Sequence, residues 1–335
     1  MDAERSRRTP VSVVVALFNA ETTIVPCLKA LATQDYPIDE IIVVDNASTD
    51  GSVARVEDYL PECPAPVRLV RQKVNGGLAT SYNTGMALAR SPLVVFLHAD
   101  SMLPSPCELG RLVEPLLSDD GAVASFPILL MPEEVWGRFP FWQKYLFARV
   151  ARREQPCMCG KFDCIRKAVY ERVGGHDAQR FLHDAGYGGE DSNLNARLRK
   201  QGRIIGTNAR VVHLHDLSDA YGLSNLFRAR KNYARTYGKI LRFEGLSPII
   251  HKLPFFVKPA LACLLPASYF FWPVLAIFAA YTLAYSKRMY TTRHTLLNPR
   301  ILLVPFVDAA LLYYETYWFA EGLLTPPADA VRRED

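Results

Sequence analysis

The chain of 335 residues has few of the features that mark small secreted domains. Its seven cysteines form no disulfide framework, and a chain of this length can bury a core without cross-links. Cys157, Cys159 and Cys164 lie close together, but a second ligand pair at zinc-site spacing is absent, so we interpret them as reduced thiols in the core. The first ten residues contain no apolar run of the signal-peptide type. We therefore expect the N-terminal half to stay in the cytoplasm.

A strong excess of charge is also lacking. The formal net charge is +5, and the basic residues gather between residues 228 and 300, which argues against a general nucleic-acid binder. The Gly-x-Ser-x-Gly elbow of many hydrolases is absent, as is a Gly-x-Gly-x-x-Gly loop after the first predicted strand. Hydrolase and dehydrogenase functions are therefore poorly supported, and we expect no nucleic-acid partner.

Short apolar segments rich in β-branched residues alternate with helical stretches from residue 11 to about residue 207. This alternation is typical of parallel strands joined by helices. The predicted strands are residues 11–17, 40–44, 67–70, 93–97 and 122–126. The sequence therefore predicts an α/β domain with a mostly parallel central sheet.

Polar residues follow several of these strands. Asn19 and Glu21 come after the first strand, Asp45 ends the second, and His98 and Asp100 follow the fourth. Ligands bind beyond the carboxyl ends of the strands in open parallel sheets. We therefore expect these side chains to converge on one crevice.

The composition changes after residue 214. Residues 226–243 place apolar side chains at helical spacing between basic ones, which predicts a basic amphipathic helix. The predicted apolar positions are Leu226, Tyr233, Tyr237 and Ile240. Four of the basic side chains could hold the phosphate of a polyprenyl carrier. They are Arg228, Arg230, Lys231 and Arg235.

A long uncharged segment, residues 259–286, follows. It exceeds the roughly 20 apolar residues that cross a bilayer core. Because basic residues flank both of its ends, we expect both to face the cytoplasm, and a re-entrant hairpin broken near Pro266 and Pro273 fits better than a single span. The last apolar segment, residues 301–324, contains three acidic residues and is predicted to be an interfacial or cavity-lining helix.

Four segments, taken in order, resemble the family 2 glycosyltransferases with a GT-A fold. They read VSVVVALFNAE, EIIVVDNASTDGS, NGGLATSYNTG and LVVFLHAD, and the resemblance covers residues 11–216. It implies a nucleoside-diphosphate sugar donor, UDP- or GDP-linked. It also implies that Asn19, Glu21 and Asp45 line the nucleotide pocket, and that the loop of Asn75, Gly76 and Gly77 approaches the donor at the start of a helix.

The triplet His98-Ala99-Asp100 stands where such enzymes usually carry Asp-x-Asp, the pair that holds a divalent cation against the donor diphosphate. Only the second acid is retained. The resemblance implies that Asp100 ligates Mn²⁺ or Mg²⁺, while His98 could add an imidazole ligand suited to Mn²⁺ or only hydrogen-bond the nucleotide. His213 and His215 alternate on a predicted strand, which would place both on one face. One of them is expected to be a further metal or diphosphate contact, and the choice stays open.

Residues 186–198 are similar to the glycine-rich loop of the family that ends in Glu-Asp and opens a helix. An inverting transfer needs a carboxylate that accepts the proton of the attacking hydroxyl. Asp191 is our first choice and Glu190 the second, while simple capping of the helix is the alternative. Gly160 and the residues 174–177, which include His176, also correspond to family positions near the acceptor.

Together these features predict an inverting, metal-dependent transfer of a sugar to a lipid-linked acceptor, either polyprenyl phosphate or a lipid-linked saccharide. The expected location is the cytoplasmic face of the bacterial inner membrane. A processive polysaccharide synthase would ordinarily show a Gln-x-x-Arg-Trp element, which is absent, and an inactive scaffold is disfavoured by the intact acidic residues. The predicted organisation is a basic tail (1–10), a GT-A domain (11–222), a basic amphipathic region (223–250), membrane-associated helices (251–325) and a polar tail (326–335).

Overall fold

The computed structural model describes residues 9–179, 189–215, 221–245, 253–269 and 272–325. The predicted polar tail, most of the predicted basic tail and residues 186–188 of the glycine-rich loop lie outside these ranges. The chain divides into two compact units. The first comprises the described parts of Met1–Met131, Arg152–Leu182 and Glu190–Asp216, and the second those of Pro132–Ala151, His183–Gly189 and Leu217–Asp335.

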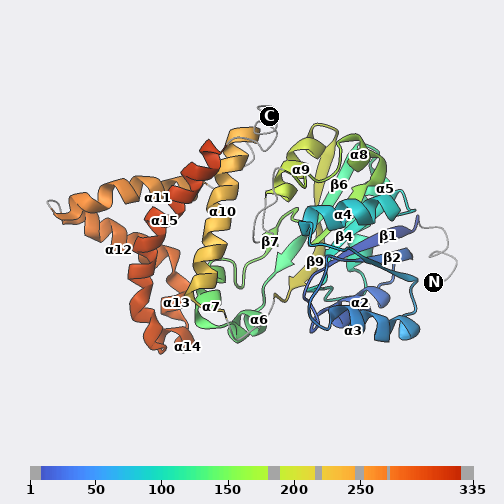
Figure 1. The fold of residues 1–335 in the computed structure, drawn as a ribbon, viewed down its shortest axis with the longest axis horizontal. Coiled ribbons are helices and arrows are strands. Elements are labelled where there is room, and N and C mark those ends of the chain that lie inside the picture. The colour runs from blue at the N-terminus through green and yellow to red at the C-terminus, as the bar shows by residue number, and fades with distance from the viewer. Residues whose placement is uncertain (1–8, 180–188, 216–220, 246–252, 270–271, 326–335) are drawn as a thin grey trace. The chain divides into compact units, whose positions relative to one another are not determined.

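One mixed sheet forms the centre of the first unit in the described part of the chain (Figure 1). Its order is β3-β2-β1-β4-β8-β6-β9-β5, and β7 pairs with β6. The strands are β1 (Val11–Leu17), β2 (Ile38–Asp45), β3 (Val67–Arg71), β4 (Leu93–His98), β5 (Ser101–Met102), β6 (Ala122–Leu130), β7 (Gln155–Pro156), β8 (Phe162–Arg166) and β9 (Arg203–His213). All five predicted strands are present, with β1 at the predicted bounds.

The sheet is mixed, where the sequence predicted a mostly parallel one. The pairs β1–β2, β1–β4, β2–β3 and β6–β9 are parallel, whereas β4–β8, β6–β8, β6–β7 and β5–β9 are antiparallel. The physical reason is β8, which lies between β4 and β6 and runs against both. Because β8 reverses direction, β4 and β6 are parallel to each other, and their carboxyl ends lie at the same edge.

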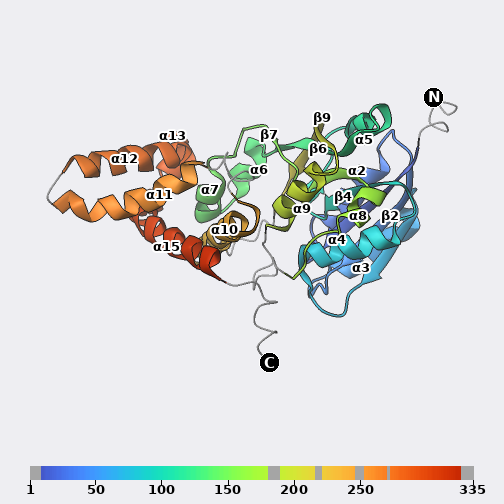
Figure 2. The same ribbon diagram turned by 90° about the horizontal axis from the view of Figure 1, so that it is seen from above.

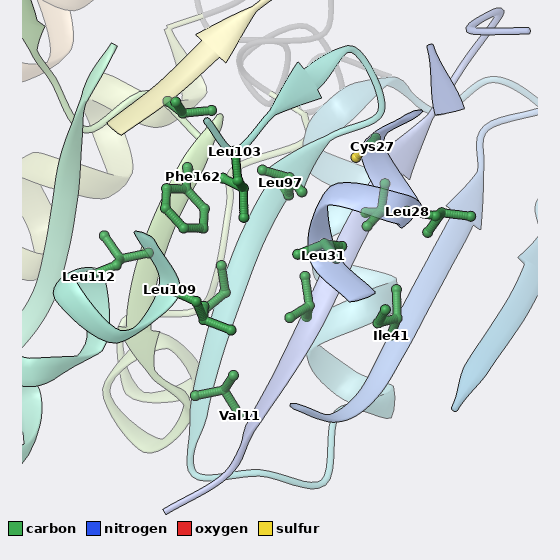
Figure 3. Close-up of a cluster of buried hydrophobic side chains, with 14 of the residues drawn as sticks. Val11, Cys27, Leu28, Leu31, Ile41, Leu97, Leu103, Leu109, Leu112 and Phe162 are labelled. Carbon is green, nitrogen blue, oxygen red and sulfur yellow. The ribbon is translucent and has the colours of Figure 1, made fainter. Parts of the chain in front are cut away.

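Helices cover both faces of this sheet (Figure 1). They are α2 (Ile24–Ala32), α3 (Ser52–Tyr59), α4 (Gly77–Leu88), α5 (Glu108–Ser118), α8 (Lys167–Arg172) and α9 (Glu190–Arg199), with the 3-10 turn η1 (Leu60–Glu62). Side chains that alternate along a strand point to opposite faces. Val13 and Val15 of β1 therefore pack with α2, α3 and α5, while Val14 packs with α4, α8 and α9. Figure 3 shows part of the first cluster, including Leu28 of α2 and Leu109 of α5. Each fully buried side chain of this size contributes about 1.5–3 kcal/mol of burial free energy.

The second unit is helical in its described part. Its elements are α6 (Glu133–Arg138), α7 (Phe141–Phe147), α10 (Leu223–Glu244), α11 (Leu253–Leu264), η3 (Leu265–Tyr269), α12 (Pro273–Tyr285), α13 (Lys287–Thr291), α14 (Arg293–Leu296), η4 (Pro299–Leu303) and α15 (Val304–Leu324). Residues 132–151 belong to this unit, although they fall within the range predicted for the GT-A domain. The predicted amphipathic helix is α10, with Leu226 and Ile240 buried and Tyr233 exposed.

Helices α10 and α15 approach each other closely through two glycines. A Cβ on Gly238 would lie 2.2 Å from the carbonyl oxygen of Phe319, and one on Gly322 would lie 2.1 Å from that of Arg235. Two acidic residues of α15 are buried: Asp308 accepts a hydrogen bond from Tyr145, and Glu315 pairs with Lys258. Each carboxylate thus has a partner inside the unit.

Helices α11 and α12 lie side by side as a hairpin (Figures 1 and 2). The 3-10 turn η3 contains Pro266, and α12 begins at Pro273, so the chain breaks its helices where the prolines predict. Among the helices that the structure describes, none is long and apolar enough to cross a membrane. Entry of this hairpin into a membrane therefore stays a prediction.

A candidate active site at one edge of the sheet

The strand ends converge as predicted. Leu17 of β1 is paired with Asp45 of β2, and Ala16 of β1 is paired with His98 of β4. Because β6 and β9 are parallel to each other and β6 is parallel to β4, the end of β9 at His213 reaches the same edge. The predicted crevice residues therefore come from neighbouring strands of one unit.

The loops after β1 and β2 hold each other in place. Asn19 donates its backbone N–H to Ser48 Oγ at 3.0 Å and accepts a bond from Thr49 N at 2.8 Å through its Oδ1. Glu21 accepts a bond from Gly51 N at 3.2 Å. The two predicted nucleotide ligands therefore use side-chain oxygens to shape the loops, and their contact with a donor stays a prediction.

The glycine loop is fastened to the second strand by a residue that the sequence analysis did not single out. Asn46 donates to Asn75 Oδ1 at 2.7 Å and accepts from Gly76 N at 2.9 Å. Asp45 is buried and accepts a bond from Ser48 N at 3.1 Å. Helix α4 begins at Gly77, whose φ of 80° suits glycine. The predicted loop and helix start are both present.

Three side chains from two parts of the chain form a set that could hold a metal ion. Ligand atoms of His98, Asp100 and His213 all lie within 4.8 Å of one another. His213 Nε2 is 2.9 Å from Asp100 Oδ2, and His98 Nδ1 is 3.8 Å from Asp100 Oδ1. The short antiparallel pair β5–β9, which aligns Ser101 with His213, brings them together.

The charge states of this set suit metal ligation. Burial, together with the nearby charge of Lys161, lowers the pKa of His98 to about 3. Burial alone would raise the pKa of Asp100, but His213 and His98 hold it well below its usual range. A neutral imidazole and an ionised carboxylate both offer lone pairs to a cation. Among the described residues, the buried Nε2 of His98 has no hydrogen-bond partner.

The structure distinguishes the two candidate histidines of the β9 region. Strand β9 ends at His213, and His215 follows with a φ of 58°, so the two do not alternate along one strand as predicted. Only His213 belongs to the three-residue set in the described part of the chain. His215 lies against it with ring centroids 3.7 Å apart, and burial lowers the pKa of His215 well below its usual value.

Asp191, the first candidate for the catalytic base, lies in the first turn of α9. Its Oδ1 is 3.4 Å from His176 Nε2, and a Cβ on Gly160 would lie 3.1 Å from the same oxygen. Burial alone would raise the pKa of Asp191, but the hydrogen bond with His176 and the charge of Lys161 lower it. The carboxylate is therefore ionised near neutral pH and can accept a proton. Glu190, the second candidate, directly precedes Asp191 in the sequence and is also buried.

Tyr82 of α4 connects the metal set with Asp191, and the sequence analysis missed it. Its ring centroid lies 6.2 Å from that of His98 and 5.4 Å from that of His176. Its hydroxyl donates to the carbonyl of Gly160 at 2.5 Å. Gly160 N donates to Asp163, whose pKa is raised by burial. Tyr82 lies in the quoted segment NGGLATSYNTG, but nothing in that segment indicates its contact with Gly160.

The predicted phosphate-binding residues lie in the second unit, and three of the four have partners there. Arg230 contacts Tyr285 and pairs with Glu315, Lys231 lies 3.8 Å above the ring of Trp318, and Arg235 pairs with Glu321 at 2.6 Å. Arg228 is exposed. Phosphate binding by these four residues stays a prediction.

Comparisons with known proteins agree on the kind of domain. Residues 12–174 match the model of glycosyl transferase family 2. The chain is 34% identical over 114 residues to the uncharacterized glycosyltransferase YibD of Escherichia coli (strain K12), covering 34% of this chain and 32% of the relative. It is 35% identical over 95 residues to the uncharacterized glycosyltransferase EpsJ of Bacillus subtilis (strain 168), covering 28% of this chain and 27% of the relative. The matches thus span about a third or less of these relatives.

A solved structure resembles the chain over most of its length. The mannosyltransferase PcManGT from Pyrobaculum calidifontis, in complex with GDP-Man and Mn²⁺, aligns with a TM-score of 0.60 and 22% sequence identity. The alignment covers 94% of this chain and 88% of that chain. At this identity the likeness bears on the fold alone.

Proposed function

Because the chain belongs to glycosyltransferase family 2 through residues 12–174 and folds there as a GT-A-like domain, we propose that it transfers a sugar from a nucleoside-diphosphate donor to an acceptor, with inversion at the anomeric carbon. The observation that carries the proposal is the meeting of two groups at one edge of the sheet: the set of Asp100, His98 and His213, and the ionised Asp191. One group suits a diphosphate and its cation, and the other suits a hydroxyl that must lose its proton.

The donor side would be organised by a divalent cation held by Asp100 and His213, with His98 as a third ligand. Such a cation neutralises charge that builds on the departing diphosphate. Two imidazoles beside one carboxylate favour Mn²⁺ over Mg²⁺, because imidazole is a softer ligand than an oxygen. The related fold of PcManGT was solved with GDP-Man and Mn²⁺, and we propose a UDP- or GDP-linked donor here.

A donor screen tests this proposal. We expect UDP- or GDP-sugars to raise the unfolding temperature of the full chain in the presence of Mn²⁺, and to raise it less without the metal, because a ligand that binds the folded state stabilises it by linkage. Binding at about a hundred times Kd corresponds to roughly 2.7 kcal/mol. Differential scanning fluorimetry provides the readout, with dTDP-sugars and free sugars as controls.

Two outcomes would contradict the proposal. The absence of a shift with every sugar nucleotide, with and without Mn²⁺, would mean that the crevice does not take this donor class. A shift without hydrolysis or transfer of the bound donor would instead favour a scaffold that has kept the fold and lost the chemistry.

We also propose that the acceptor is lipid-linked, as polyprenyl phosphate or a lipid-linked saccharide, at the cytoplasmic face of the bacterial inner membrane. The support comes from apolar side chains that the second unit leaves exposed. Around η3 and α12 these are Tyr269, Trp272, Leu275, Ile277 and Leu283. Aromatic and aliphatic residues on an exposed hairpin suit the interface of a lipid bilayer.

The outer side of α15 carries a second exposed apolar stripe. Leu303 precedes it, and Phe306, Tyr313 and Tyr317 follow at helical spacing, while Val307 and Leu311 on the other side are buried. A helix that is apolar on all sides is normally covered on all sides. Exposed basic residues near this stripe, Lys287, Arg293 and Arg300, favour anionic lipid headgroups as the covering surface.

Binding to lipid vesicles tests the membrane proposal. We expect the full chain to float with vesicles that contain phosphatidylglycerol, and Leu275→Glu to weaken this binding about tenfold, because a leucine of 51% exposure would lose its apolar burial in the lipid. Leu117→Glu is the matched control, since Leu117 is 46% exposed on α5 of the first unit. Equal affinities for the wild type and both variants would contradict the proposal, as would a wild type that does not float.

A further inference from the structure

His176 lies directly beside the candidate base. It follows Gly174 and Gly175, which both have positive φ, at the end of the segment after α8. Its side chain is 1% exposed, and its Nε2 is 3.4 Å from Asp191 Oδ1. A polar side chain buried to this extent needs partners. The contact with Asp191 supplies one of them.

The other side of the imidazole is fixed by two residues of the same unit. Tyr170 of α8 places its hydroxyl 2.6 Å from His176 Nδ1. Asn83 of α4 accepts a bond from His176 N and donates one to His176 O, both at 2.9 Å. The Tyr170 hydroxyl also donates to Asn83 Oδ1 at 2.6 Å. The ring and the backbone of His176 are therefore both held.

The direction of these bonds follows from proton counting. The Tyr170 hydroxyl has one proton and donates it to Asn83 Oδ1, because an amide oxygen can only accept. His176 Nδ1 therefore donates to the Tyr170 oxygen. An imidazole that also donates to the ionised Asp191 carries a proton on Nε2 as well, so the form that bonds both partners has a proton on each ring nitrogen.

We propose that His176 is a positioning residue for the transfer reaction: its Nε2–H holds one oxygen of Asp191 and leaves the other free to accept the proton of the acceptor hydroxyl. The inference rests on the proposed function, because Asp191 acts as the base only if the chain is a transferase. Tyr170 and Asn83 fix the orientation of His176, as outer hydrogen-bond partners do for metal-bound imidazoles.

Removal of His176 should shift the acid limb of the profile of transfer activity against pH to a higher pH. Other charged or titratable groups face Asp191 in the part of the chain that the structure describes. They are His98 of β4, Tyr82 of α4, Tyr170 of α8, and Cys157, Cys159, Lys161 and Asp163 before or in β8. The hydrogen bond with His176 lowers the pKa of Asp191 against the effect of burial. Without it the pKa of Asp191 rises, so the base becomes protonated at a higher pH, and activity is lost earlier as the pH falls.

The test compares His176→Phe, which keeps the ring but removes the donor, with His176→Gln, whose amide can donate from a similar position. We expect His176→Phe to lower kcat about tenfold and to move the acid limb up by about one pH unit, the scale of one charge-assisted hydrogen bond. His176→Gln should stay within about threefold of the wild type. Donor affinity should be unchanged in both.

A second measurement keeps the inference independent of turnover. Carboxyl ¹³C NMR of the full chain, with the Asp191 signal assigned from Asp191→Asn, should show a raised Asp191 pKa in His176→Phe and a smaller rise in Tyr170→Phe. An unchanged Asp191 titration in both variants would overturn the positioning role. A wild type without any transfer, but with the expected NMR shifts, would sink the proposed function and leave the His176–Asp191 contact standing.

Discussion

Asp191→Asn should reduce turnover at least about a hundredfold, which is the usual scale for the loss of a general base. An amide keeps the size of the carboxyl group and cannot accept the proton of the attacking hydroxyl. Binding of the donor should change little, because the metal set and the nucleotide loops lie at the ends of strands, whereas Asp191 lies on α9. Steady-state kinetics, together with titration of the donor by calorimetry, separates the two effects.

Glu190→Gln is the matched control for this variant. Glu190 neighbours Asp191 in α9 and is also buried, so the same change of charge and size is made one residue away. We expect it to retain most of the activity. If Glu190→Gln abolished transfer while Asp191→Asn remained near normal, the role of the base would pass to Glu190.

The strands of this fold could be predicted because burial on both faces leaves a simple sequence signal. The segments that became β1, β2 and β4 are nearly continuous apolar runs, as parallel central strands usually are. Strand β8 has the sequence FDCIR, in which the buried Asp163 interrupts the apolar residues. Nothing in such a segment indicates that it pairs antiparallel with two strands, because the direction is set by the chain's path.

The site was only partly accessible to sequence analysis for a related reason. Asp100 and Asp191 stand in recognisable motifs, whereas the choice of His213 over His215 depended on where β9 ends. The contact between Tyr82 and Gly160 spans 78 residues, and that between Asn83 and His176 spans 93. Such contacts arise from the order of strands in the sheet, which local patterns do not encode.

Helix α10 illustrates a different limit of prediction from the sequence. Regular spacing in α10 predicted an amphipathic helix correctly, yet it could not tell which basic side chains stay open to a ligand. Glu321, the partner of Arg235, lies 86 residues further along the chain. Whether a surface arginine is free or paired is decided by helix packing, here by the close approach of α10 and α15 through Gly238 and Gly322.

Asp100→Ala should abolish the gain in donor affinity that Mn²⁺ provides, by a factor of about ten to a hundred, the range seen when residues that support a metal site are lost. Asp100 is the one carboxylate of the set, so its removal leaves only imidazole ligands for the cation. We expect His213→Ala to approach the same loss, since its Nε2 lies 2.9 Å from Asp100 Oδ2. His98→Ala should lose less, because its Nδ1 lies 3.8 Å from the carboxylate.

Calorimetric titration of UDP and GDP with and without Mn²⁺ measures this gain for each variant. Asp119→Ala is the control. Asp119 lies just before β6, and its carboxylate pairs with Arg203 at the start of β9. Both residues therefore lie at the edge of the sheet opposite the metal set. This variant should keep the full effect of the metal. A Mn²⁺ gain that survives in Asp100→Ala would place the cation elsewhere, whereas a loss in His98→Ala equal to that in Asp100→Ala would make His98 a full ligand. In that case the histidine of the His-Ala-Asp triplet would replace the missing first carboxylate in function as well as in position.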